Sequence, residues 1–414
     1  MEHLEDMRRD AAEIVREAVR TCLPDEAVRR ALAGMRFPRP VILAAVGKAA
    51  WRMAESAYGV LGPEGISRGI VITKTGHSEG PIGSLLIREA PHPVLGEAAV
   101  RAAEELLEMV SGLTAEDTVL FLVSGGGSAL LEYPLIPLEE LADVNRQLLA
   151  CGASIEEINA VRKRLSGVKG GRFARRCAPA KVVSVLLSDV LGDRPDIIAS
   201  GPACPDPSTC REAEEVARRY GLRLSEAARE CLRKETPKVL ENAEYQVIGS
   251  VSRLCRAAAA AAEKRGYGAE LLTDRLSCQA KEAGRLLASE ARARLPRLTR
   301  PAALIAGGET VVELRGKGLG GRCQELALAA AEGLCGLPAV LLAAGSDGTD
   351  GPTDAAGGFA DGCTAEALAG AGVSIPAALA ENDAYHALQK VGNLWITGPT
   401  GTNVNDVCVL LLWP

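Results

Sequence analysis

The chain has 414 residues, a length typical of two or three domains, and 47% of its residues are hydrophobic while 24% are charged. The formal net charge is −6, which argues against nucleic acid as the main partner because no excess of cations is present to neutralise phosphates. No run of about 18 apolar residues is present, and the charged N-terminus lacks the apolar core of a signal peptide. We therefore expect a cytoplasmic monomer or homodimer without a membrane partner.

The twelve cysteines are irregularly spaced, and no C-x-x-C pair occurs. Paired cysteines at regular spacing would indicate disulfides or a zinc site, and this pattern indicates neither. We expect buried free thiols, which is the usual state of cysteine in the reducing cytoplasm.

In the first half of the chain, short apolar runs alternate with longer segments of helical period. The apolar runs cover residues 41–47, 69–74, 118–124 and 181–189, and helices are expected at 96–110 and 137–151. The runs are continuous rather than alternating, which is typical of parallel strands that are covered on both faces. This order predicts a doubly wound, Rossmann-like α/β sheet.

A polar stretch at 222–244, which contains Pro237, separates a second set of apolar runs. We place a domain boundary near residue 238, which gives domains 1–238 and 239–414. Strands of the second domain are expected at 245–250, 269–274, 302–309, 310–314, 339–347 and 406–412. Ala-rich segments of helical period connect several of them, so this domain is also predicted to be α/β.

Charged residues and glycines follow the apolar runs directly. The run at 41–47 is followed by Lys48, the third run by a glycine cluster, and later runs by Asp189, Glu309 and Asp347. In open α/β sheets, ligands bind at the carboxyl ends of the strands. These side chains are therefore the first candidates for a binding site.

The glycine cluster reads "SGGGS" and consists of Ser124, Gly125, Gly126, Gly127 and Ser128. Glycines after a strand let backbone N–H groups approach an anion, and the flanking hydroxyls can donate hydrogen bonds as well. The cluster is therefore predicted to hold a phosphate or carboxylate. The alternative is a tight turn from strand to helix without a ligand.

A second glycine cluster, "GKGLGGRCQE" at 316–325, formally matches the G-x-G-x-x-G pattern of dinucleotide sites. The acidic residue expected about 20 positions later is not clearly placed, because Asp347 lies in its own glycine-rich loop. Arg322, at the expected start of a helix, is better interpreted as a clamp for phosphate.

The segment 159–176 is rich in lysine and arginine. Lys163, Lys169 and Arg172 are candidates for ligand binding because glycines beside them would bring the backbone close to a ligand. His92, between two prolines, is a candidate substrate contact or a structural turn.

Asp189, Glu309 and Asp347 are the candidates for contact with Mg²⁺, directly or through water, because carboxylate oxygens are its preferred protein ligands. The Asp-Gly pairs at 343–362 superficially match a calcium loop, but the full spacing and the terminal glutamate are missing.

Eight ordered motifs together resemble the glycerate kinases whose second half is a MOFRL domain, and the match covers nearly the whole chain. The motifs are "VGKAA" (46–50), "SGGGSALL" (124–131), "VRKRLSGVKGGR" (161–172), "SDVLGD" (188–193), "IASGPACPDPST" (198–209), "GKGLGGRCQE" (316–325), "GSDGTDGPTDAAG" (345–357) and "TGPTGTNVND" (397–406).

The resemblance implies transfer of the γ-phosphate of ATP to D-glycerate with Mg²⁺, with 2-phosphoglycerate as the product of many bacterial and archaeal members. It also implies a Rossmann-like domain, a MOFRL-type α/β domain and an active site in the cleft between them. Related chains have often been labelled hydroxypyruvate reductases. An NAD(P)H-dependent reductase and a non-catalytic nucleotide-binding protein therefore remain the alternatives.

The functional lysine of the family corresponds to Lys48, and its functional arginine corresponds to Arg322. Two positions depart from the family pattern: Arg164 replaces a histidine, and Cys323 replaces an asparagine. We expect Lys48 and Arg322 to act on the γ-phosphate or on the glycerate carboxylate, and Asp189 to accept the proton of the substrate hydroxyl. The residues alone do not decide between the 2-hydroxyl and the 3-hydroxyl.

Overall fold

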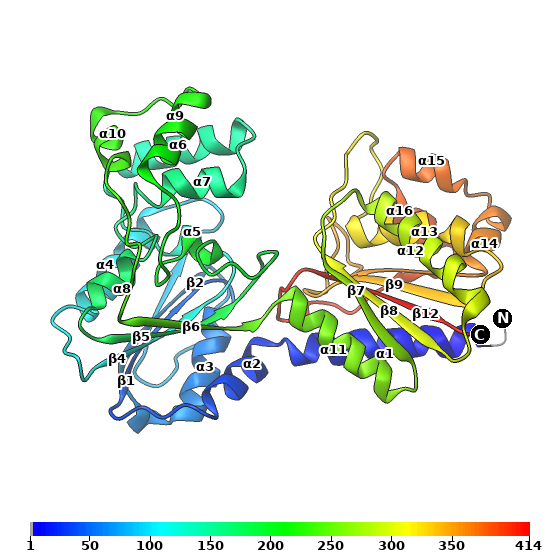
Figure 1. The fold of residues 1–414 in the computed structure, drawn as a ribbon, viewed down its shortest axis with the longest axis horizontal. Coiled ribbons are helices and arrows are strands. Elements are labelled where there is room, and N and C mark those ends of the chain that lie inside the picture. The colour runs from blue at the N-terminus through cyan, green and yellow to red at the C-terminus, as the bar shows by residue number, and fades with distance from the viewer. Residues whose placement is uncertain (1–2) are drawn as a thin grey trace. The chain divides into compact units, whose positions relative to one another are not determined.

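The computed structural model describes residues 3–414, and its elements divide into two units (Figure 1). Pro24–Ile248 form one unit, here called the parallel-sheet unit. Residues 3–23 and Gly249–Pro414 form the other, here called the mixed-sheet unit. The sequence assigned residues 1–238 to one domain, whereas in the structure the first helix packs with the second half of the chain.

The parallel-sheet unit is built on a sheet with the strand order β3-β2-β1-β4-β5-β6. The strands are β1 (Val41–Val46), β2 (Ile66–Lys74), β3 (Leu86–Ala90), β4 (Thr118–Val123), β5 (Lys181–Leu187) and β6 (Ala243–Gly249). The pairings from β3 through β5 are parallel. Every residue of β1 and β4 is buried, as expected for strands covered on both faces. The predicted doubly wound sheet is confirmed.

Helices of this unit fall into two groups. The first group lies along the sheet or at its ends: α2 (Pro24–Leu32), α3 (Ala50–Leu61), α4 (Glu97–Met109), α5 (Gly127–Leu130), α8 (Arg172–Cys177), η1 (Pro63–Gly65) and η2 (Ile198–Ser200). The second group is α6 (Leu138–Ala150), α7 (Ile155–Arg162), α9 (Cys210–Arg219) and α10 (Glu226–Leu232). The second group packs around its own apolar cluster, which includes Leu148, Val161 and Leu232, and we call it the helical cap (Figure 1).

The mixed-sheet unit has the strand order β11-β10-β9-β12-β8-β7. The strands are β7 (Gly268–Leu276), β8 (Ala302–Gly308), β9 (Ala339–Gly345), β10 (Gly357–Asp361), β11 (Leu394–Trp395) and β12 (Asp406–Leu412). β7 and β8 are parallel, while β12 runs antiparallel to both β8 and β9. As a result, the first residue of β12 lies beside the last residues of its two neighbours.

Helices cover the mixed sheet on both faces (Figure 1). They are α1 (Leu4–Thr21), α11 (Val251–Lys264), α12 (Ala280–Arg294), η3 (Leu295–Arg297), α13 (Arg322–Leu334), α14 (Thr364–Gly370), α15 (Ile375–Ala380) and α16 (Ala384–Lys390). Glu17 of α1 accepts hydrogen bonds from Lys264 and Arg265 at the end of α11. These contacts, with the buried apolar face of α1, explain why this helix belongs to the mixed-sheet unit.

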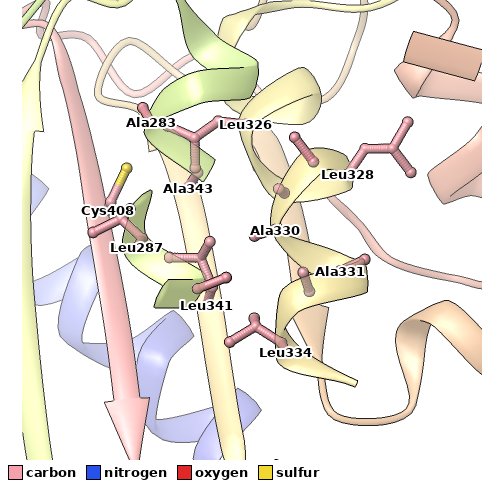
Figure 2. Close-up of a cluster of buried hydrophobic side chains, with 14 of the residues drawn as sticks. Ala283, Leu287, Leu326, Leu328, Ala330, Ala331, Leu334, Leu341, Ala343 and Cys408 are labelled. Atoms are coloured by element: carbon pink, nitrogen blue, oxygen red, sulfur yellow. The ribbon is translucent and has the colours of Figure 1, made fainter. Parts of the chain in front are cut away.

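The core of the mixed-sheet unit is made of alanine and leucine rather than aromatic residues (Figure 2). Small side chains let α12 and α13 approach closely. A methyl group on Gly284 of α12 would lie 2.1 Å from the carbonyl oxygen of Leu326 in α13. A larger residue there would force the two helices apart.

One predicted strand is wrong. Residues 310–314 form only an isolated bridge, in which Val311 pairs with Gln279, and Leu314 is 81% exposed. The run was predicted to be a strand, but Val311 and Leu314 face solvent, while Thr310 is buried and Val312 packs against the core. Within residues 3–414, no helix combines the length and the apolar character needed to cross a membrane.

Candidate active site

The strand order of the parallel sheet reverses between β1 and β4. These strands are neighbours, with Val46 opposite Val123, while β2 and β5 lie on their outer sides. Such a reversal opens a crevice at the carboxyl ends of the two strands, where doubly wound proteins bind ligands. The N–H of Lys48, just after β1, donates to the carbonyl of Gly125, just after β4, over 2.9 Å.

Each glycine of the "SGGGS" loop has its own steric reason. A methyl group on Gly125 would lie 2.2 Å from Oδ2 of Asp189, and one on Gly127 would lie 2.7 Å from Cβ of Ala199. Gly126 has a φ of +86°, a left-handed conformation that favours glycine. The loop therefore brings the backbone into direct contact with the end of β5, where Asp189 lies.

The two serines of this loop have different roles. Ser124 is buried, and its hydroxyl accepts a hydrogen bond from the N–H of Ala49 at the start of α3. This corrects the expectation that Ser124 binds a ligand, because its oxygen is used to join β4 to the first helix. The hydroxyl of Ser128 lies 2.9 Å from that of Ser200, which in turn donates to Asn159. The N–H groups of Gly126 and Ser128 donate to no other described residue.

Lys48 supplies a positive charge at the same place. Its ammonium forms no hydrogen bond or ion pair with any residue in the described range 3–414. A methyl group on Gly126 would lie 3.2 Å from Cγ of Lys48 and 3.1 Å from Nε2 of His92. Burial lowers the pKa of His92, and the charges of Lys48 and Lys74 lower it further. The strand ends of this sheet therefore have a positive potential suited to an anionic ligand.

Three predicted ligand contacts have protein partners. Lys163 is buried and donates to Asp206 over 2.9 Å. Lys169 is also buried and donates to Glu132 over 2.5 Å. One guanidinium nitrogen of Arg172 donates to three backbone carbonyls, including that of Ser166. We therefore correct the expectation for Lys163 and Lys169, whose buried ammonium groups hold the basic segment in place. Arg172 is half-buried and uses one nitrogen for these bonds, so its contact with a ligand stays a prediction.

Arg164, the first departure from the family pattern, is also structural. Its guanidinium is fully buried and donates to the carbonyl of Ala160, to Ser208 and to Glu235. The arginine thus ties α7 to the loop before α9, and its head group does not face a ligand.

In the mixed-sheet unit, Arg322 opens α13 and lies among carboxylates. It donates to Glu309 over 2.7 Å and to Asp406 over 3.2 Å. Burial opposes its charge, but Asp406 and Glu309 together raise the pKa of Arg322 above its ordinary value. Arg322 is therefore held in a fixed place with a permanent charge.

Two buried carboxyl groups beside Arg322 have raised pKa values. Burial raises the pKa of Asp406 to about 7; Arg322 opposes this shift, and the charges of Asp350, Glu309 and Asp347 add to it. Burial raises the pKa of Asp350 to about 6, even though its carboxylate accepts the N–H groups of Cys323 and Gln324. The carboxylates here outnumber the single cation that is paired with them.

The proposed metal ligands fit only part of a magnesium site. The residues from 3 to 414 contain no group of three or more His, Cys, Asp or Glu that could hold a metal ion by itself. Glu309 is paired with Arg322, and Oδ1 of Asp347 accepts the N–H of Thr349. However, Oδ2 of Asp406 is buried without a hydrogen-bond partner. Magnesium usually takes one or two carboxylates and completes its shell with phosphates and water, so the residues present could contribute carboxylates to such a site but would not hold the ion by themselves.

Cys323, the second departure from the family pattern, is buried at the start of α13, next to Arg322. Its side chain is 1% exposed and belongs to the apolar core of the mixed-sheet unit. Burial raises the pKa of this thiol well above its usual value. The replacement of asparagine is therefore a change in the core.

The glycines at 316–321 serve packing. A methyl group on Gly316 would lie 2.2 Å from the carbonyl oxygen of Glu381, and one on Gly318 would lie 2.4 Å from Cβ of Asp383. The segment between β8 and α13 is long and irregular, whereas a dinucleotide fingerprint is a tight turn from strand to helix. The match to that fingerprint is coincidental.

Sequence reasoning assigned no role to Asp406, Arg162 or Glu132. Candidates were sought at the carboxyl ends of the expected strands. Asp406 stands at the first residue of a strand, so it was not considered. Only the antiparallel pairing places Asp406 opposite Gly308 and Gly345, the last residues of β8 and β9. Arg162 was one of several cations in a basic segment, and nothing in the sequence separated it from Lys163.

These sites place the chain among the α/β proteins that bind anionic substrates at strand ends. Residues 10–233 match a domain of unknown function, DUF4147, and residues 302–406 match the MOFRL family. A D-glycerate 2-kinase from Thermotoga maritima is 53% identical over 414 residues, which cover 99% of both chains. This chain belongs to the glycerate kinase family with a MOFRL domain.

Two further comparisons extend this finding. A crystal structure of a glycerate kinase from Thermotoga maritima covers 99% of this chain and 100% of its own, with 52% identity and a TM-score of 0.95. A protein from Agrobacterium vitis with the provisional name hydroxypyruvate reductase is 41% identical over 90% of this chain and 87% of its own. The fold class predicted from the sequence is thus the fold of the family.

Proposed function

We propose that this chain is a D-glycerate 2-kinase, which transfers the γ-phosphoryl group of ATP to the 2-hydroxyl of D-glycerate. The observation that carries the proposal is the 53% identity, along the whole chain, to a protein with that activity in its name. The unpaired ammonium of Lys48 at the switch point of the parallel sheet supports it.

The proposed roles follow from the partners of each side chain. Phosphoryl transfer needs positioning and neutralisation of charge rather than covalent catalysis. Lys48 would neutralise charge on the γ-phosphate or on the glycerate carboxylate. The amides of Gly126 and Ser128 would hold an anionic group. Arg322 would contribute a second cation whose place is fixed by its ion pairs.

Asp189 is the proposed acceptor of the hydroxyl proton, supported by its place against Gly125. Mg²⁺ is proposed to enter with ATP as part of the substrate, where it neutralises charge on the phosphates. Asp189, Glu309 and Asp347 remain the proposed carboxylate contacts for this ion. We also propose a cytoplasmic location, supported by buried free thiols such as Cys177 and Cys204.

The decisive experiment measures product formation from ATP, MgCl₂ and D-glycerate. Phosphorus NMR is expected to show 2-phosphoglycerate, and enolase with pyruvate kinase should convert it without a mutase. If a mutase is needed, the product is 3-phosphoglycerate. The chain would then still be a glycerate kinase, but one that phosphorylates the 3-hydroxyl. NADH oxidation with hydroxypyruvate, in the absence of ATP consumption, would instead establish a reductase, for which the packing of Gly316 and Gly318 gives no support.

A further inference from the structure

A cavity of about 410 Å³ lies within the parallel-sheet unit, between the glycine loop and the helical cap. Gly126 and Ser128 line one part of it, and the loop at 92–95, Glu132 and residues of α6 and α7 line other parts. A volume of this size falls in the range of roughly 300–1,000 Å³ that is usual for small-molecule sites. The cavity adjoins the proposed phosphate-binding loop, but none of the roles assigned above uses it.

The cavity is lined by polar groups that lack partners. The guanidinium of Arg162 makes no hydrogen bond or ion pair with the described residues, 3–414. Oε1 of Glu132 and Oδ1 of Asn145 are buried acceptors without a hydrogen-bond partner. Glu132 is 2% exposed, and its other oxygen accepts from Lys169. Buried polar atoms are nearly always satisfied, so a donor and two acceptors left open around one cavity indicate a ligand.

The remaining wall is largely apolar. It includes Pro93, Ala129 and Ile158, and at its rim Val94 and Leu149 are 71% and 72% exposed. Large apolar side chains at the mouth of a cavity gain stability when a flat apolar surface covers them. Glycerate is small and polar throughout, so it would leave this wall in contact with water. An aromatic base would cover it.

We propose that this cavity binds the purine nucleoside of the phosphate donor. The base lies against Pro93 and Leu149, its exocyclic amine donates to Glu132 or Asn145, and a ring nitrogen accepts from Arg162. The phosphates then extend toward Gly126 and Ser128, beside Lys48. The inference rests on the proposed kinase function for the identity of its ligand.

The cavity has both a hydrogen-bond donor and hydrogen-bond acceptors, which favours a nucleobase over an anionic ligand. A carboxylate or phosphate would satisfy Arg162 but would face the charged Glu132 and leave two acceptors open. A purine edge offers both a donor and an acceptor, so it can satisfy Arg162 together with one of the two acceptors. Burial lowers the pKa of Arg162 and Glu132 opposes that shift, which agrees with a partly desolvated cation beside a carboxylate.

The test uses Arg162→Gln in the full chain, because the guanidinium has no hydrogen bond or ion pair with residues 3–414 to lose. We expect KM for ATP and Kd for ADP to rise about tenfold to a hundredfold, the loss typical of a hydrogen bond to a charged group. KM for D-glycerate and the affinity for inorganic tripolyphosphate are expected to stay within about twofold. Calorimetric titration with ADP and with tripolyphosphate separates the base from the phosphates.

Leu149→Gln is the second variant, because this exposed position carries little risk for folding. It is expected to raise Kd for ADP several-fold. Val239→Gln is the matched control, since Val239 is 75% exposed in the same unit but does not line the cavity. Its Kd for ADP is expected to equal that of the unchanged chain.

Three results would overturn the inference. A rise in KM for D-glycerate alone would make the cavity the acid site. If Arg162→Gln weakens the binding of tripolyphosphate as much as that of ADP, Arg162 binds the phosphates rather than the base. Unchanged ADP binding in both variants would leave the cavity without a nucleoside. If the unchanged chain shows no kinase activity, the proposed function fails, while the ADP titrations still decide the nucleoside site.

Discussion

At the strand ends of the parallel-sheet unit the cation Lys48 is left unpaired, whereas at those of the mixed-sheet unit the cation Arg322 is paired with carboxylates. Lys48 has no acidic partner within hydrogen-bond reach among residues 3–414, and neither has Arg162 at the end of α7. Arg322, in contrast, is paired with both Glu309 and Asp406. Two α/β sheets of similar size thus carry opposite charge environments at their ligand-binding ends.

The comparison shows two ways in which a cation can be positioned for an anionic ligand. Lys48 is held by backbone contacts of its own loop, so its ammonium is open to a ligand at no cost in protein contacts. Arg322 is held by its head group, which fixes its direction but means that a ligand must compete with carboxylates. The first arrangement favours binding, and the second favours exact placement. Four substitutions test this comparison.

Lys48→Met should have the largest effect. Loss of a cation that acts on a phosphoryl transition state costs roughly 10³–10⁵ in rate, by analogy with arginine fingers, which corresponds to about 4–7 kcal/mol. We expect turnover to fall at least about a hundredfold, with an unchanged melting temperature, because no ion pair is lost. Steady-state kinetics and circular dichroism check both parts. Near-normal turnover would remove Lys48 from the site.

Arg322→Met should also lower turnover at least about tenfold, but here the fold should suffer as well. The change leaves Asp406, which is 7% exposed, beside Glu309 without a cation. Leaving a buried group unpaired costs about 1–3 kcal/mol. Thermal unfolding of the Lys48 and Arg322 variants in parallel gives the comparison. Equal melting temperatures would contradict the idea that only Arg322 is part of a stabilising network.

Lys163→Met tests the correction made for the basic segment. Its partner Asp206 is buried, and removing one member of a buried ion pair typically costs about 3–5 kcal/mol. We expect a clear loss in urea stability, while KM for ATP and D-glycerate in the folded fraction stays unchanged. Lys181→Met, which removes the exposed pair with Glu244, is the matched control and should change stability little. A raised KM in the Lys163 variant would restore its ligand role.

Asp350→Asn should have the smallest effect, which is a change in how the free energy of unfolding depends on pH. Its pKa is raised to about 6 in the fold, so between about pH 4 and 6 the folded state holds a proton that the unfolded chain has released. The contribution of Asp350 to the free energy of unfolding is therefore present at low pH and is lost as the pH rises through that window. The loss amounts to at most about 3 kcal/mol.

Urea unfolding across this pH range should show a weaker downward slope for the asparagine variant than for the unchanged chain. Asp406, whose raised pKa of about 7 acts in the same direction, remains in both chains, and its shift should become smaller in the variant because the charge of Asp350 contributes to it. Identical slopes would show that Asp350 does not titrate as described.

The amino-acid pattern predicted the four central strands of the parallel sheet well, because buried strands read as continuous apolar runs. It did not predict β3, and it assigned the strand at 245–250 to the second domain, whereas β6 belongs to the parallel sheet. It also failed at 310–314, where Val311 and Leu314 face solvent, and at β10, because Gly357–Asp361 looked like part of a glycine-rich loop. The last two errors have one origin. Hydrophobicity reports a preference for burial, but only the packing of the remaining chain decides whether burial is available.

The glycine loop and Lys48 could be found from the sequence, since they directly follow apolar runs and parallel strands bring such residues to one edge. The roles of Lys163 and Lys169 could not. A basic segment looks the same whether its charges face a ligand or buried carboxylates that are distant in sequence, such as Asp206 and Glu132.

The sequence by itself therefore determined the class of fold, the family and the residues that leave the ends of the parallel strands, because these depend on local patterns of apolar residues and glycines. Only the tertiary structure decided which charges stay open. It paired Lys163 inside the fold and left Arg162, its neighbour in sequence, on the wall of a cavity. It also brought Asp406 to Arg322 by running β12 antiparallel. The ion-pair partners of Lys163 and Arg322 come from distant segments of the chain, and the composition of a strand does not determine the direction in which it runs.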